Sequence, residues 1–237
     1  MQLFLYLALV VSALLSGMAY LFFKKTNPLY LKLALSFSGA FLFAVTVIHL
    51  IPEAYSHGGQ GIGVYILAGF LFQIVLELFS EGIEHGHVHV HHHPHAAFPL
   101  SIMLGLCVHS FFEGMPLAQR AGEEVNSGLF AGILLHHMPV AFALMSLLIA
   151  SGLSKTKSLL NLLFFSLMAP LGAFASQFIA RGFGANEVYF DRVMGVVIGI
   201  FLHISTTILF ESSEQHRFNY YKMGAILAGV GLALASF

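Results

Sequence analysis

The sequence predicts an all-α polytopic membrane protein with eight transmembrane helices. Two observations lead to this class. The chain of 237 residues is 58% hydrophobic and only 9% charged, whereas soluble proteins average about 25% charged residues. The apolar residues also form continuous runs of the length that crosses a bilayer as a helix, rather than the alternating pattern of a β-barrel. We therefore expect an integral, multi-pass membrane protein, with the lipid bilayer as one of its partners.

Eight apolar windows meet the length requirement, and turn-forming segments rich in Gly, Asn, Ser and charge separate them. They cover roughly residues 2–23, 31–52, 62–80, 98–118, 127–150, 158–180, 190–210 and 219–236. Since no linker or composition shift divides the chain, residues 1–237 are expected to form a single transmembrane domain.

The orientation follows from charge. The first window lacks the positive start of a signal peptide, and its basic residues come after the apolar run, which favours a retained helix with its N-terminus outside. With eight spans, both termini lie outside. The inner connections then hold Lys24, Lys25, Lys32, Lys155, Lys157, Arg217 and Lys222. The outer connections hold Arg120, Arg181 and Arg192.

Composition also limits the function. The single Cys107 excludes an intramolecular disulfide and a multi-cysteine metal cluster. A formal net charge of −1 gives no reason to expect a nucleic-acid partner. The 14 histidines outnumber the 10 lysines and arginines, which points toward metal ions.

Four ionisable side chains fall near the middle of two successive spans. His109 and Glu113 lie in the fourth window, and His136 and His137 lie in the fifth. Ionisable groups at membrane depth are costly and mark functional sites by default. A structural polar clamp between helices is the alternative, and the matched depth of the two spans favours the functional interpretation.

The spacing of these residues suits a metal ion. His109 and Glu113 project from one helix face, and zinc accepts both a His nitrogen and a Glu oxygen. His136 and His137 differ by about 100° around their helix, so both cannot point directly at one ion. We favour His136 as a ligand and His137 as a partner, a relay or a weaker ligand.

Proline accompanies this cluster. Pro116, Pro139 and Pro170 lie in spans four, five and six, and each is expected to break its helix and free a carbonyl. The freed carbonyls belong to Phe112, Leu135 and Ser166. Such carbonyls need polar partners within lipid, so the pattern predicts a polar passage.

A His-rich cytoplasmic loop, residues 81–97, joins spans three and four. It contains His85, His87, His89, His91, His92, His93 and His95. Such tracts bind transition metals, here weakly and in several arrangements. A nonspecific solvated linker is the alternative, and buffering and sensing both remain open as roles.

Other polar residues rank lower. His49 and Glu53, near the outer end of span two, either help ion entry or line the surface. His203, in the middle of span seven, either faces the pathway or bonds between helices, and Glu77 is expected to extend to the cytoplasmic side. Four further acids are expected at the cytoplasmic end of the bundle: Glu81, Glu84, Glu211 and Glu214. They either give the inner mouth an acidic character or form an ordinary solvated rim.

Four local motifs resemble those of the ZIP family of metal transporters. HSFFEGMPLA (109–118) is similar to the family's fourth-span signature, and HHMP (136–139) to the start of its fifth-span motif. HLIPEA (49–54) resembles the end of the family's second span, and APLGA (169–173) resembles its sixth-span element EPLGA. A His-rich cytoplasmic loop between spans three and four is also common in the family.

The resemblance implies a ZIP-like bundle that forms a single transporter domain over residues 1–237, with both termini outside. It implies uptake of a divalent metal, usually Zn2+ as the transported substrate, through a site between spans four and five. Spans one, four, five and six would move against a scaffold of the others. Because dimers are common in the family, a homodimer is expected, and a plasma (inner) membrane is favoured over an internal one.

Departures from the family pattern limit the number of ions. Val140 stands where the fifth-span motif usually has an acid, His137 stands where an acid or Asn is frequent, and Ala169 replaces the sixth-span Glu. In binuclear members of the family those acids build the second metal position. The sequence therefore predicts a mononuclear site.

The expected ligands are His109, Glu113 and His136. The fourth is open among water, Ser110, His137 and a group from span two or seven. An incomplete shell suits a carrier that must release its ion. Nitrogen ligands favour zinc over magnesium or calcium, while iron, manganese, cobalt, nickel and cadmium stay open.

Two other functions are weighed against transport. An intramembrane zinc-dependent hydrolase would use similar ligands, but the sequence has no H-E-x-x-H helix and no separate carboxylate beside the pair to act as a base. A non-transporting metal receptor would bind metal through the loop without flux. Transport is preferred, so the chain is not expected to be an enzyme.

Overall fold

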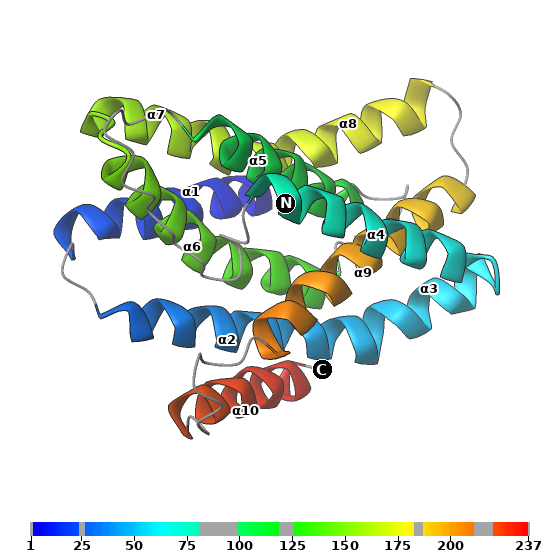
Figure 1. Cartoon of the computed structure of the whole chain (residues 1–237). Coiled ribbons are helices and arrows are strands. Elements are labelled where there is room, and N and C mark those ends of the chain that lie inside the picture. Colours follow the sequence, from blue (N-terminus) through cyan, green and yellow to red (C-terminus); the bar gives the residue numbers. More distant parts are fainter. Residues whose placement is uncertain are drawn as a thin grey trace.

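The computed structural model describes residues 2–23, 27–80, 99–118, 126–182, 187–210 and 220–236, and these residues form an all-helical bundle (Figure 1). In chain order the elements are α1 (Gln2–Phe22), α2 (Pro28–Val45), the π-helix η1 (Thr46–Leu50), α3 (Ile51–Gly58), α4 (Ile62–Ser80), α5 (Leu100–Gly114), the 3₁₀-helix η3 (Met115–Leu117), α6 (Ser127–Ala150), α7 (Lys155–Ser166), α8 (Met168–Gly182), α9 (Glu187–Phe210) and α10 (Tyr220–Ala235).

Seven segments of the described chain are long and apolar enough to cross a membrane. They are Leu3–Phe22, Pro28–Gly58, Ile62–Phe79, Leu100–Leu117, Ser127–Ala150, Lys155–Gly182 and Val188–Phe210. The eighth apolar helix, α10, is shorter, at 16 residues. These eight segments match the eight predicted windows, which confirms the predicted fold class.

Polar caps at the breaks explain where several helices begin. Asn27 accepts a hydrogen bond from the Leu29 backbone N–H at 3.0 Å, and Pro28 follows it in the first turn of α2. Asn126 caps α6 through the N–H of Leu129, also at 3.0 Å. The second span therefore starts a few residues before the predicted window.

Proline interrupts two of the three spans in which a break is predicted. In the fourth span, α5 gives way at Met115 to the short 3₁₀-helix that contains Pro116. The sixth span divides into α7 and α8 at Leu167, three residues before Pro170. The predicted break at Pro139 is wrong, because α6 continues through it. Packing of α1 and α2 along α6 holds this helix together around the missing hydrogen bond.

The second span contains an irregularity that the hydrophobic pattern does not predict. Residues Thr46–Leu50 form a π-helix, in which the Ile51 N–H bonds to the Thr46 carbonyl. Pro52 follows at once and lacks an N–H, so the helix register changes just before it. His49 lies within this turn.

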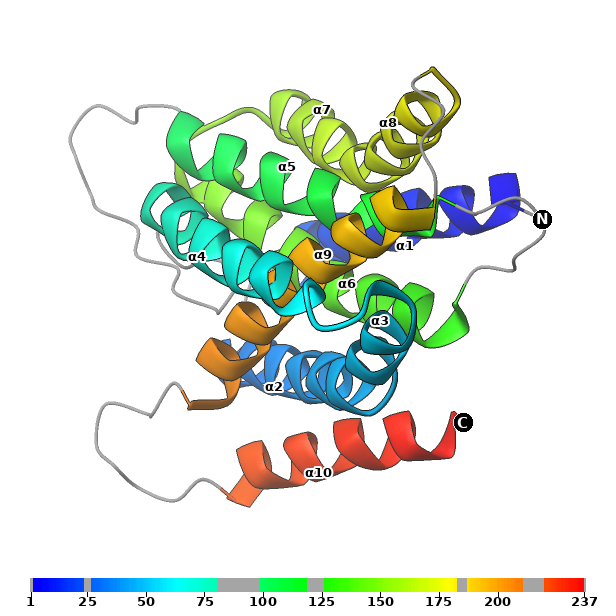
Figure 2. The ribbon, with the colours of Figure 1, turned by 90° about the vertical axis from the view of Figure 1, so that its right-hand side faces the viewer.

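The helices associate in long pairs: α4 with α9, α2 with α10, α1 with α6, and α5 with α8. Figure 2 shows α10 at the edge of the bundle beside α2, and α5 between the α4–α9 and α7–α8 pairs. The start of α1 and the end of α10 lie at one end of the bundle, and the end of α4 and the start of α5 lie at the other. The start of α1 and the end of α10 therefore share a side, as the eight predicted crossings require, and the assignment of that side as outside stays a prediction.

Glycines bring three of these pairs into backbone contact. A Cβ atom on Gly69 or Gly199 would overlap a carbonyl across the α4–α9 interface. One on Gly114 or Gly172 would do the same between α5 and α8, and one on Gly229 would meet the backbone of α2 from α10. Small residues permit such close approach in membrane helices, where dispersion and packing replace the hydrophobic effect.

This packing predicts which glycine is sensitive to substitution. We expect Gly199→Ala to lower the free energy of unfolding by about 1–3 kcal/mol, because the added methyl group forces two backbones apart. Thermal melting in detergent micelles measures this effect. Gly224→Ala in α10 is the matched control, because no atom lies within 4 Å of its added Cβ. Equal melting temperatures for the two variants would contradict the backbone contact.

Candidate metal site

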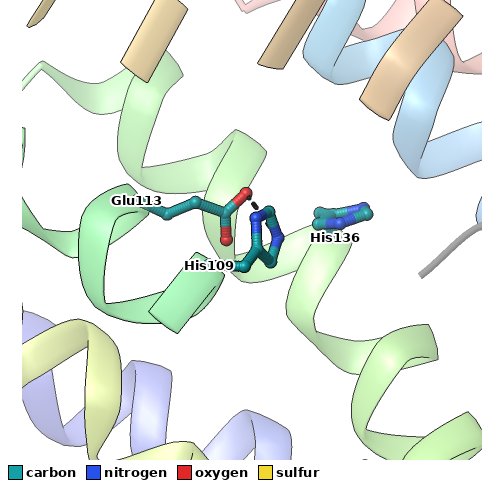
Figure 3. Close-up of side chains that lie close together, drawn as sticks. All are labelled: His109, Glu113 and His136. Atoms are coloured by element: carbon teal, nitrogen blue, oxygen red, sulfur yellow. Dashed lines mark ion pairs between the residues drawn. The ribbon is translucent and has the colours of Figure 1, made fainter. Parts of the chain in front are cut away.

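Three buried side chains from two helices converge in the middle of the bundle. His109 and Glu113 come from α5 and His136 comes from α6, and one potential ligand atom of each lies within 4.8 Å of the other two. Figure 3 shows the Glu113 carboxylate against the His109 ring, with His136 approaching from the second helix. None of the three residues is more than 1% exposed.

The apolar core explains the position of this group. The buried hydrophobic residues form two clusters, one containing Leu106 and the other containing Leu117. On α5, His109 and Glu113 lie between these two leucines, and on α6 His136 lies between residues of the same two clusters. The ionisable groups thus form a polar layer between two apolar ones.

The two oxygens of Glu113 have different partners. His137 Nε2 lies 2.7 Å from Oε2, the length of a strong charge-assisted hydrogen bond. His109 Nε2 lies 3.2 Å from Oε1. This is an ion-pair distance, and it is also close to the roughly 3.3 Å between two ligands of one tetrahedral zinc ion.

His136 supplies the second imidazole at this level. Its ring centroid lies 6.0 Å from that of His109, with the planes at 87°. Both ring nitrogens of His136 are buried without a hydrogen-bond partner among the described residues. Leaving such groups unpaired costs about 1–3 kcal/mol each. A bound cation would offer one of these nitrogens a partner.

His137 faces a different neighbour, as the 100° step predicts. Its ring hydrogen-bonds to Glu113 and lies 5.7 Å, between centroids, from the ring of Phe165 in α7. Of the three predicted roles, that of a partner to the ligand carboxylate fits this contact best. Partners of this kind orient metal ligands in many sites.

A profile described as "ZIP Zinc transporter" matches residues 84–236 of the chain. The chain belongs to the ZIP zinc transporter family. The matched region contains both helices that carry the site, and the resemblance predicted from four motifs is confirmed. Because ZIP proteins are transporters and not enzymes, the family assignment disfavours the intramembrane hydrolase.

Similarity to individual proteins agrees with this family assignment. The chain is 31% identical to zinc transporter ZIP9 of Micropogonias undulatus over 153 residues, 61% of this chain and 49% of that protein. It is 34% identical to ZIP9-B of Xenopus laevis over 113 residues, 46% of this chain and 37% of that protein. An uncharacterized protein of Methanocaldococcus jannaschii is 25% identical over 210 residues, 83% of this chain and 82% of that protein. The chain spans about half the length of the ZIP9 proteins, or less.

The positions that depart from the ZIP pattern lie beside the site. Val140 is 1% exposed and Ala169 is fully buried, and the backbone of Ala169 contacts Gly114, the residue after Glu113. The surroundings on this side are therefore apolar. Ser110, also predicted as a ligand, is buried, and its hydroxyl has no hydrogen-bond partner in the described part of the chain.

The two residues of the second span that were predicted to help ion entry lie outside this group. His49 is half-buried in η1 and Glu53 is exposed on α3. Glu53 Oε2 accepts a hydrogen bond from Asn126 Nδ2 at 3.0 Å, which links α3 to the cap of α6. Neither residue belongs to the group formed by His109, Glu113 and His136.

Glu77 and His203 form a pair that the sequence pattern does not predict. Glu77 Oε2 of α4 lies 3.3 Å from His203 Nε2 of α9. Glu77 therefore meets a neighbouring helix instead of simply extending to the surface. The sequence shows one acid within α4 and one His within α9. Only the contact between these two helices in the fold brings the two side chains together.

Several predicted residues lie outside the part of the chain that the structure describes. They are His85, His87, His89, His91, His92, His93 and His95 of the loop, with Glu81, Glu84, Glu211 and Glu214.

The link between Glu53 and Asn126 predicts unequal effects of substitution. Asn126→Ala removes a helix cap and is expected to lower the free energy of unfolding by about 0.5–2 kcal/mol. Glu53→Ala removes one exposed hydrogen bond and should cost no more than about 0.5 kcal/mol. Denaturant unfolding in micelles measures both values. Asn126→Ser keeps a capping oxygen and should remain near wild type; a Glu53→Ala cost as large as that of Asn126→Ala would contradict the assignment.

Proposed function

We propose that the protein transports zinc, or a similar divalent transition metal, across the membrane into the cytoplasm. One observation carries this proposal: in a ZIP-family chain, His109, Glu113 and His136 meet at the buried centre of the helix bundle. Ionisable side chains at membrane depth mark ion pathways. The relatives named as zinc transporters support zinc as the substrate.

The proposed site holds one ion between α5 and α6. His109 Nε2, Glu113 Oε1 and one nitrogen of His136 act as ligands, and their distances support this set. Ser110 or water completes the shell. The buried methyl groups of Val140 and Ala169 support a single ion, because they add no ligand for a second one.

Charge compensation favours a dication at this position. A carboxylate taken out of water is costly unless it is paired and hydrogen-bonded. His137 satisfies Glu113 Oε2, and the ion would interact with Oε1. Imidazole nitrogen and carboxylate oxygen together suit zinc and its transition-metal neighbours better than magnesium or calcium.

The distribution of glycine contacts supports relative movement of two helix groups. Contacts between backbones join α5 to α8, within the group that the family resemblance expects to move, and α4 to α9 and α2 to α10, within the expected scaffold. Between the groups, a Cβ on Gly132 of α6 would meet the Leu42 side chain of α2, at 2.9 Å. A side chain can change rotamer during sliding, whereas a backbone cannot.

The direction of transport and the choice of membrane rest on the charge pattern. Among the described residues, exposed Lys32, Lys155 and Lys157 are assigned to one side, and exposed Arg181 and Arg192 to the other. The positive-inside rule makes the lysine side cytoplasmic. We propose uptake through a plasma (inner) membrane on this basis.

Two further elements of the proposal rest on sequence alone. The loop histidines at 85–95 bind divalent metal weakly, in support of capacity or regulation. A homodimer is also proposed, because dimers are common in the ZIP family. A non-transporting metal receptor is the remaining competitor, and a flux measurement separates it from a transporter.

Uptake into proteoliposomes tests the function directly. The purified chain should carry Zn2+ inward, and Glu113→Gln should reduce uptake to the level of protein-free vesicles, because the neutral amide cannot compensate the ion. Glu113→Ala should do the same, and Gly224→Ala serves as the control for reconstitution. Metal binding without flux in the wild-type chain would favour a receptor, and full uptake by Glu113→Gln would exclude the proposed site.

The roles of the two adjacent histidines are separable by metal titration. In protein whose loop histidines are replaced by asparagine, His136→Ala should remove Co2+ binding at the central site. His137→Ala should weaken binding about 10–100-fold, as loss of a partner to a ligand does, with the visible Co2+ spectrum unchanged in shape. A changed spectrum in His137→Ala and an unchanged one in His136→Ala would reverse the assignment.

A further inference from the structure

We infer that Ser16 of α1 is a positioning residue for the central metal site, because its hydroxyl holds the backbone of α6 directly after the turn that carries His136 and His137. Its bearing on metal binding rests on the proposed function, since it concerns the same site. The contact that carries the inference is a hydrogen bond of 2.6 Å that Ser16 Oγ donates to the carbonyl oxygen of Met138.

The hydroxyl of Ser16 behaves differently from its counterparts elsewhere in the bundle. Serine and threonine hydroxyls in helices commonly donate to a carbonyl three or four residues earlier in their own helix. Among the described residues, every other Ser or Thr hydroxyl that donates to a backbone carbonyl does so. Ser12, one turn before Ser16, donates to the Leu9 carbonyl at 3.0 Å. Ser16 instead joins two helices.

The acceptor lies where α6 is weakest. Pro139 has no N–H, so the Leu135 carbonyl loses its partner within the helix, and the proline ring crowds that carbonyl. Helices bend most readily at such positions. The turn between Leu135 and Pro139 carries both histidines, so a change of bend there would move their rings relative to α5. Ser16 holds Met138, the last residue before the proline.

Further contacts of α1 fix the segment of α6 that follows the proline, where the two helices run side by side (Figure 1). A Cβ atom on Gly17 would lie 3.1 Å from the Ala141 carbonyl oxygen and 2.5 Å from Cδ2 of Leu162 in α7. One turn further along α1, the ring of Tyr20 meets the ring of Phe142 edge-on, with 5.4 Å between centroids. The bond of the serine is therefore one part of a close contact that spans the proline.

A second route leads from α1 to His137 through α7. Leu162 and Phe165 are three residues apart, so they share a face of α7, and both are fully buried. Leu162 packs against Gly17 of α1. The ring of Phe165 lies 5.7 Å from the ring of His137. The same short segment of α1 thus contacts the backbone next to His137 and a helix that packs against its ring.

The geometry of the site depends on the direction of this turn. His137 Nε2 lies 2.7 Å from Glu113 Oε2, and the ring of His136 lies 6.0 Å from that of His109. Binding sites require their side chains to be held within about 0.5 Å of the productive geometry. Loss of the Ser16 hydroxyl removes no ligand, so we expect weaker binding rather than loss of binding.

A bond that only helps α1 and α6 to associate is the competing explanation. Hydrogen bonds between membrane helices make modest contributions to stability. That explanation predicts a lower melting temperature for Ser16→Ala and an unchanged metal affinity well below the melting temperature. A positioning role predicts a change in affinity that depends on the proline.

Co2+ titration in detergent micelles tests the inference on the chain whose seven loop histidines are replaced by asparagine, so that visible absorption reports the central site. Ser16→Ala should weaken binding about 3–10-fold, less than the roughly 10–100-fold expected for a direct partner of a ligand. Ser16→Thr keeps the hydroxyl and should restore the affinity. Ser12→Ala is the matched control and should change nothing, because Ser12 bonds within α1.

The proline supplies the decisive comparison. Pro139→Ala restores an N–H for the Leu135 carbonyl, so α6 no longer depends on a neighbouring helix at this turn. In this background Ser16→Ala should alter Co2+ affinity by less than about twofold. Unchanged affinity in Ser16→Ala, equal weakening in both backgrounds, or equal weakening by Ser16→Ala and Ser16→Thr would overturn the positioning role.

Hydrogen exchange without metal tests the contact separately. Amides of residues 134–142 should exchange faster in Ser16→Ala than in the wild-type chain or in Ser12→Ala, because the backbone around the proline opens more often. Equal exchange in the three proteins would overturn the inference.

Failure of this inference and failure of the proposed function give different results. Zn2+ uptake and Co2+ binding that are both insensitive to Ser16→Ala would leave the transporter standing and remove the role of Ser16. Absence of Zn2+ uptake and of Co2+ binding in the parent protein would overturn the proposed function, and the role of Ser16 in placing the ligands would fall with it.

Discussion

The carboxylate of Glu113 has no exposed surface, although it lies among membrane-spanning helices. A buried charge of this kind persists only when each of its oxygens is compensated. His137 reaches one oxygen from α6 and His109 approaches the other from α5. The polar contacts between α5 and α6 at this level therefore centre on satisfying this one group.

The rest of the bundle supplies the rigidity that such a layer needs. Apolar clusters lie on both sides of it, and they separate the ionisable groups from water at either end. Gly114 brings α8 against α5 directly after Glu113, so the backbone that carries the carboxylate cannot shift freely. The same kind of contact at Gly199 fixes α9 on α4 and brings His203 to Glu77.

Much of this arrangement was predictable from patterns along the chain. Continuous apolar runs predicted the eight helices, because helix length in a bilayer is set by its thickness. The four-residue spacing of His109 and Glu113 predicted a shared face, and antiparallel neighbours predicted that His136 would lie at the same depth. The continuity of α6 through Pro139 and the π-turn before Pro52 were not predicted, because neighbouring helices decide how a freed backbone group is satisfied.

The sequence by itself determined the spans, the family and the residue types available to a metal ion. Only the tertiary structure decided which pairs of these residues meet. It paired His137 with an oxygen of Glu113, placed His136 close to His109 and Glu113, and joined Glu77 to His203 across two helices far apart in the chain. The physical reason is that periodicity sets the direction of a side chain only relative to its own helix. The partner it meets depends on the rotation and contact of the neighbouring helix, which glycine backbone packing sets between α4 and α9.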